Sequence, residues 1–127
     1  MMPGLSSVFL LLGSLNAMLA VMLGAFGAHG LKNILTADML AVFNTGVQYH
    51  FYHALGLLVV GLIATQLPAS MQIKWSGWLM FVGIVLFSGS LYVLAITGLR
   101  CLGAITPIGG VCFILAWGML AYAVYKT

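Results

Sequence analysis

The chain has 127 residues, of which 64% are hydrophobic and only 4% are charged. A water-soluble domain has roughly 25% charged residues, so this chain lacks the polar surface that solubility requires and its expected partner is the lipid bilayer. Its formal charge of +3 comes from dispersed side chains that form no basic patch, so nucleic acid is not an expected partner.

The few charged residues separate four long uncharged runs, and each run can supply one membrane-spanning helix. A helix needs roughly 20 residues to cross a hydrocarbon core of about 30 Å. The expected helices lie near residues 5–28, 47–65, 75–97 and 107–125. Residues 1–127 are therefore expected to form a single transmembrane domain, an all-α bundle of four transmembrane helices.

The first expected helix carries two rows of small residues. One row is Gly13 and Ala17, and the other is Ala20, Gly24 and Ala28. Helices in lipid associate through close backbone approach and interhelical hydrogen bonds, which small residues permit. We therefore expect these residues to pack against another helix, either within the bundle or in a second copy of the chain.

The connection after the first helix, about residues 29–46, is the longest. Thr36 can cap a short helix within it, and Asp38 in the first turn is favourably placed against the helix dipole. Apolar residues follow directly, which predicts a short interfacial helix in this first loop.

The second expected helix begins with a polar segment that contains Tyr49, His50 and His53. The two histidines lie about 60° apart on one helix face. We expect His53 about 6–9 Å below the membrane surface and near His29, which follows the first helix. Because an unsatisfied polar group in hydrocarbon costs several kcal/mol, His29 and His53 should share a hydrogen-bonded cluster of neutral side chains that includes Tyr49 or the first loop.

The three histidines (His29, His50 and His53) are also the candidate ligands for a metal such as zinc or copper, and a bis-histidine haem is a further alternative. Both are minority outcomes, so no metal and no cofactor is assigned.

Other polar residues lie within the expected spans. Asn16, in the middle of the first helix, must find a partner inside the bundle and is interpreted as a contact between helices. The third helix carries a polar strip that includes Ser90 and Tyr92, and Gly98 suits its C-terminal cap. Thr106, before a proline, is the expected N-cap of the fourth helix. Ser90, Tyr92 and Thr106 complete the candidates for a ligand site or polar cluster.

No catalytic arrangement is recognisable. With a single acidic residue, catalysis by paired carboxylates is excluded, and no nucleophile occurs with a base and an orienting group. We therefore expect a non-enzymatic packing, scaffold or accessory protein that forms a homo-oligomer or joins a larger membrane complex. The alternative is a small channel or carrier for a proton, an ion or a small neutral solute, because polar groups inside a membrane are functional candidates.

Four blocks resemble a small membrane family of unknown function, which has bacterial members such as YgdD and YwdK and a related mitochondrial protein. The blocks are Gly24–Leu31, Gln48–Leu55, Leu86–Tyr92 and Ile105–Gly110. The resemblance covers nearly the whole chain and implies a four-helix protein of the cell inner membrane without a settled activity. By that pattern, the positions that match the family motifs are His29, His53, Ser90, Tyr92, Thr106 and Pro107.

The basic residues orient the chain only weakly. Lys74 and Lys126 fall on the side of the termini, and Lys32 and Arg100 fall on the other side. The α-amino group on the first side and Asp38 on the second favour cytoplasmic termini by the positive-inside rule.

Overall fold

The computed structural model describes residues 4–67 and 70–127, and these residues form helices joined by short turns. Within them, four helical segments are long and apolar enough to span a membrane. The segments are Leu5–His29, Ala37–Ala64, Met71–Thr97 and Arg100–Lys126. The expected four-helix membrane fold is confirmed.

The second helix differs from its expected bounds. Helix α1 covers Leu5–His29, and α2 covers Ala37–Ala64, so α2 begins at Ala37 rather than near residue 47. Thr36 caps α2, since its hydroxyl oxygen accepts a hydrogen bond from the Met39 backbone N–H at 3.2 Å. The expected separate interfacial helix is therefore wrong: this segment is the start of α2. Gly46 lies within α2, and the Tyr92 ring packs so closely against it that a Cβ there would collide with the ring.

The third span is interrupted by one turn of π-helix. It consists of α3 (Met71–Gly83), the π-helix η1 (Ile84–Ser88) and α4 (Gly89–Thr97). The hydroxyl of Ser70 caps its start by accepting from the Ile73 backbone N–H at 3.3 Å. The span ends, as expected, at Gly98, which adopts the left-handed conformation with φ 75°.

The fourth span begins with a short 3₁₀ helix, η2 (Arg100–Ala104), and continues as α5 (Thr106–Lys126). The N-cap position of α5 is Ile105, so the prediction that Thr106 caps this helix is wrong. The hydroxyl of Thr106 instead lies 2.6 Å from the hydroxyl of Ser90.

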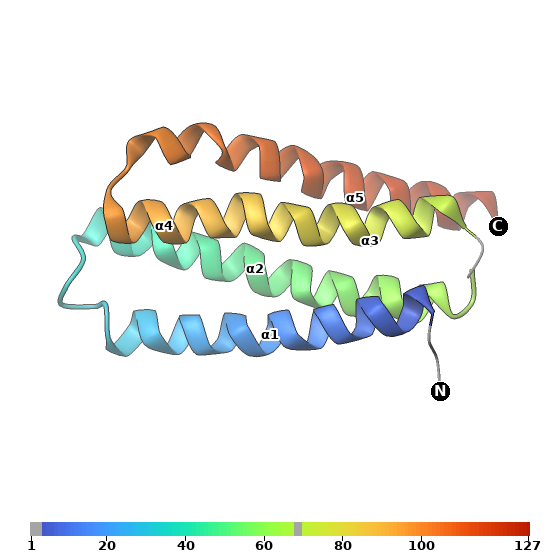
Figure 1. Cartoon of the computed structure of the whole chain (residues 1–127), viewed down its shortest axis with the longest axis horizontal. Coiled ribbons are helices and arrows are strands. Elements are labelled where there is room, and N and C mark those ends of the chain that lie inside the picture. The colour runs from blue at the N-terminus through green and yellow to red at the C-terminus, as the bar shows by residue number, and fades with distance from the viewer. Residues whose placement is uncertain (1–3, 68–69) are drawn as a thin grey trace.

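The spans run antiparallel to their neighbours in sequence, and both termini lie at one end of the bundle (Figure 1). Helix α1 packs along α2, α2 packs against the third span, and α5 packs along α3 and η1. A smaller share of the first and fourth spans is buried than of the second and third spans. They are therefore the outer helices, with one face on the bundle and another facing outward.

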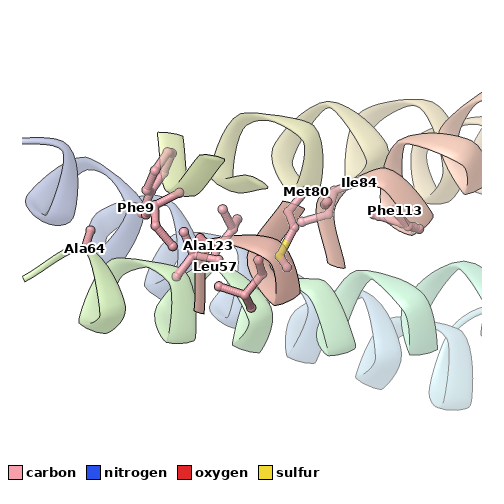
Figure 2. Close-up of a cluster of buried hydrophobic side chains, with 11 residues drawn as sticks. Phe9, Leu57, Ala64, Met80, Ile84, Phe113 and Ala123 are labelled. Carbon is pink, nitrogen blue, oxygen red and sulfur yellow. The ribbon is translucent and has the colours of Figure 1, made fainter. Parts of the chain in front are cut away.

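Two apolar clusters occupy the bundle. The larger lies toward the termini and draws on all four spans, with Phe9, Leu57, Met80 and Phe113 among its members (Figure 2). The smaller lies toward the first and third loops and centres on Phe43.

Glycines permit the closest approaches between helices. A Cβ at Gly77 would collide with the ring of Phe9, and a Cβ at Gly109 would collide with the backbone of Phe87 in η1. The π-helical turn is thus in close contact with α5 at Gly109. Side chains larger than hydrogen at Gly77 and Gly109 would push the helices apart.

Candidate functional site

A set of hydrogen-bonded polar side chains lies between the two apolar clusters. On α2, Phe43 of the smaller cluster precedes them and Leu57 of the larger cluster follows them. We call this set of residues the polar layer; its members are Asn16, Gly46, His50, His53, Ser88, Tyr92 and Trp117.

His50 connects three helices through one chain of hydrogen bonds. The side-chain N–H₂ of Asn16 donates to the Leu12 carbonyl at 2.8 Å, so the amide oxygen of Asn16 is turned toward His50. His50 Nε2 lies 2.9 Å from that oxygen and must donate to it. In neutral His50, Nδ1 is then the acceptor, and the Tyr92 hydroxyl donates to it at 2.8 Å. The chain joins α1, α2 and α4 across the interior.

His53 is held by a separate set of contacts with α5. Trp117 can only donate, so its Nε1–H donates to His53 Nε2 at 3.0 Å. The remaining ring nitrogen, Nδ1, carries the proton and donates to the backbone carbonyl of Tyr49 at 2.8 Å. The ring stacks on Phe113 with centroids 3.5 Å apart. This geometry describes a neutral imidazole with both nitrogens bonded within the chain.

Serine hydroxyls add links between the third span and its neighbours. Ser88 donates to the Gly46 carbonyl of α2 at 2.8 Å, and Ser76 donates to the Ala116 carbonyl of α5 at 2.7 Å. Within the described residues, every buried side-chain nitrogen and oxygen has a hydrogen-bond partner. The interior polar groups therefore hold the helices together.

The structure separates His29 from the other histidines. Gly13 lies against Ala54, because a Cβ at Gly13 would be 2.9 Å from the Ala54 carbonyl oxygen. His29 is sixteen residues beyond Gly13 on α1, or about 24 Å at 1.5 Å per residue, whereas His53 neighbours Ala54. The expectation that His29 and His53 share a cluster is therefore wrong, as is the shallow depth expected for His53. The error follows from the earlier start of α2, which moves His53 to the middle of the bundle.

The histidines also do not form one three-ligand group. His50 is bonded toward α1 and α4, His53 is bonded toward α5, and His29 is exposed at the end of α1. Among the described residues, no group of three or more histidine, cysteine or acidic side chains is close enough to hold a metal ion.

The other candidates occupy different parts of the structure. Tyr92 is in the polar layer, whereas Ser90 and Thr106 bond each other near the loop end. Tyr49 contributes its backbone carbonyl to His53, and its ring, which is 38% exposed, packs against Phe87.

Sequence reasoning missed two residues that form hydrogen bonds between helices, the buried Ser76 and Trp117, which is 42% exposed and bonds the buried His53. An indole N–H in the middle of a membrane helix needs an acceptor, which is the signal that could have singled out Trp117. Ser76 carries no comparable signal, since a serine can also bond within its own helix.

A family model described as "Protein of unknown function (DUF423)" matches residues 23–110. The chain belongs to this family. It is 57% identical over 119 residues to the UPF0382 membrane protein YwdK of Bacillus subtilis, covering 94% of this chain and 97% of that protein. It is 56% identical over 119 residues to the UPF0382 membrane protein SSP2132 of Staphylococcus saprophyticus, covering 94% of this chain and 98% of that protein. No solved structure matches the chain.

The resemblance to the bacterial membrane family is thus confirmed, and the chain is a multi-pass membrane protein of uncharacterised function. Its polar layer lies inside residues 23–110 except for Asn16 and Trp117. Both exceptions come from the outer helices, α1 and α5.

The outer surface of this family member has a groove of about 480 Å³ between α1 and α2. Its lining residues are Ala20, Val21, Gly24, Ala25, Val47, Gln48, Phe51 and Tyr52. We call this the α1–α2 groove. Two of the predicted packing residues, Ala20 and Gly24, are part of its lining.

The remaining predicted packing residues lie elsewhere. Gly13 is buried against α2, Ala17 is half-buried, and Ala28 is exposed. Gly27, which is not among the predicted packing residues, is buried against the Phe43 ring.

Gln48 and Tyr52 place polar groups on the outer surface near the middle of α2. The Gln48 side-chain N–H₂ donates to the Tyr52 hydroxyl at 2.7 Å, and both residues are exposed. Within the described residues, the Gln48 amide oxygen, its second N–H and the Tyr52 O–H make no further hydrogen bond. These groups differ from the polar layer in retaining hydrogen-bonding capacity that faces away from the bundle.

Proposed function

We propose that this protein is a non-catalytic subunit of a membrane assembly, and that its α1–α2 groove receives a transmembrane helix of a second copy or of a larger complex. The observation that carries the proposal is the outward-facing pair of Gln48 and Tyr52. Polar groups that face hydrocarbon without full hydrogen bonding cost several kcal/mol, so a helix that supplies partners would be favoured there.

The shape of the groove supports the same proposal. Ala20, Gly24 and Ala25 on its α1 wall are small, and small residues let a neighbouring backbone approach closely. The groove therefore offers close packing on one wall and hydrogen bonds on the other. The polar layer is a weaker basis for transport, because its buried groups are already bonded within the chain.

The proposed location is the cytoplasmic membrane, with both termini on the cytoplasmic side. Support comes from Lys74 and Lys126 at one end of the bundle, because the acidic Asp38 offsets part of the positive charge of Lys32 and Arg100 at the other end.

The proposal is tested by comparing one substitution on two outer surfaces. Ala25→Leu fills the α1–α2 groove, whereas Ala121→Leu makes the same change on the exposed face of α5. Chemical cross-linking in native membranes, followed by blue native electrophoresis and mass spectrometry, should show an assembly that is lost in Ala25→Leu and retained in Ala121→Leu.

A second variant separates docking from folding. Gln48→Leu removes the outward amide, so it should weaken the assembly while leaving the thermal stability of the isolated chain in detergent unchanged or higher. A wild-type chain that is monomeric in native membranes would contradict the proposal. An assembly that survives both Ala25→Leu and Gln48→Leu would also contradict it.

A further inference from the structure

A second surface groove, of about 560 Å³, lies at the loop end of the bundle, where α2 begins and α4 passes into η2. We call it the loop-end groove. Its lining residues are Thr36, Asp38, Met39, Val42, Leu94, Gly98 and Arg100. It is distant from the termini, which lie at the opposite end (Figure 1).

This groove brings together opposite charges that are far apart in the sequence. Asp38 is the only acidic residue of the chain, and Arg100 is one of only four basic residues. Both are exposed and line the same groove, yet these two described residues form no ion pair within 4.0 Å. Because neither charge is neutralised by the other, both remain available to a bound group that carries the opposite charges.

The depth of the groove suits a lipid headgroup. Helix α2 has 28 residues and is about 42 Å long, which matches the roughly 40–45 Å of a bilayer with its headgroup regions. Asp38 in the first turn of α2 therefore lies at headgroup level. Met39, Val42 and Leu94 are half-buried and supply an apolar wall beside the charges.

We propose that the loop-end groove binds a phospholipid whose headgroup carries a primary ammonium and a phosphodiester, as in phosphatidylethanolamine. The ammonium donates hydrogen bonds to the Asp38 carboxylate, and the Arg100 guanidinium donates to the phosphate oxygens. An acyl chain lies along the apolar wall.

The two charges together define which lipid fits. An anionic lipid such as phosphatidylglycerol can bond Arg100, but it offers no cation to Asp38. A quaternary ammonium, as in phosphatidylcholine, has no N–H to donate to the carboxylate. Phosphatidylglycerol can reach Asp38 only through neutral hydroxyls, whereas a headgroup with both a donating cation and an anion sets a hydrogen-bonded opposite charge against each side of the groove.

The test is native mass spectrometry of the full chain released from nanodiscs with equal amounts of phosphatidylethanolamine, phosphatidylglycerol and phosphatidylcholine. Wild-type protein should retain phosphatidylethanolamine about tenfold or more over the other lipids, the ratio expected for one hydrogen bond to a charged group. Asp38→Asn should remove the preference over phosphatidylglycerol, and Arg100→Gln should abolish retention of phosphatidylethanolamine.

Lys32→Gln is the matched control, because it removes one exposed cation from the same end of the bundle outside the groove. It should leave the wild-type ratio unchanged, and thermal scans should show that all variants remain folded. Equal retention of the three lipids by wild-type protein, or a preference for phosphatidylglycerol, would overturn the proposal. So would a Lys32→Gln effect as large as that of Arg100→Gln. None of these outcomes depends on the α1–α2 groove.

Discussion

Polar side chains on the two faces of α2 differ in their exposure and in their hydrogen bonding. His50, on the inner face, is 2% exposed and has both ring nitrogens bonded to other helices. Tyr52, on the outer face, is 49% exposed and bonds only Gln48 of its own helix within the described residues. Both faces cross the same apolar medium. The difference indicates that inward polar groups stabilise the fold, whereas outward ones are available to a partner.

The sharpest test of this difference is a pair of substitutions on α2. His50→Leu leaves the Asn16 amide oxygen and the Tyr92 hydroxyl without their interior partner, so it should lower the free energy of unfolding by about 2–4 kcal/mol. Gln48→Leu should change it by less than about 0.5 kcal/mol. Reversible unfolding in mixed micelles measures both values. Equal effects of the two substitutions would remove the distinction between the faces.

Glycines provide a second comparison between inside and outside. Gly109→Ala should destabilise the fold by about 1–3 kcal/mol, because its Cβ would collide with the Phe87 backbone in η1. Gly118→Ala, also on α5, adds a Cβ with nothing within 4 Å. It should be neutral or slightly stabilising, since alanine favours helix over glycine by about 1 kcal/mol. Thermal unfolding of the two variants checks this expectation, and a stable Gly109→Ala protein would contradict the close contact between α5 and η1.

Substitutions of an inward and an outward serine should give the smallest difference in unfolding free energy. Ser88→Ala removes a hydrogen bond from η1 to the Gly46 carbonyl of α2 and should cost about 0.6 kcal/mol, a typical value between membrane helices. Ser14→Ala removes only a bond to Leu10 of its own helix on the exposed face, so its effect should be close to zero. The same unfolding measurement applies, and a larger loss from Ser14→Ala would contradict the assignment of that face to the exterior.

The features that could be predicted from the sequence are those that depend on local chemistry. Long uncharged runs identified the spans, because a charge inside hydrocarbon is costly. Thr36 and Gly98 were correctly placed as caps, since capping depends on the backbone within a few residues. The start of α2 was not predicted. From its sequence alone, the segment around Gly46 was predicted to be a loop. In the structure it is helical, and Gly46 packs against Tyr92.

The candidate site was predicted only in part. Asn16 was correctly expected to bond within the bundle, since a polar group there needs a partner. The partner itself could not be inferred, because the register between α1 and α2 decides which residue of one helix lies opposite Asn16. The same register places His29 far from His53. Trp117 reaches His53 because α5 packs along the third span.

The sequence by itself thus determined that the chain lies in a lipid bilayer, how many spans it has and where several helices end. These features follow from hydropathy, charge and capping, which act over short stretches of chain. Only the tertiary structure decided which polar groups meet, which face outward, and that Asp38 and Arg100 line one groove. The physical reason is that these outcomes depend on the relative depth and rotation of packed helices. Steric contacts such as that of Gly13 with Ala54 set this depth and rotation, and no single segment encodes them.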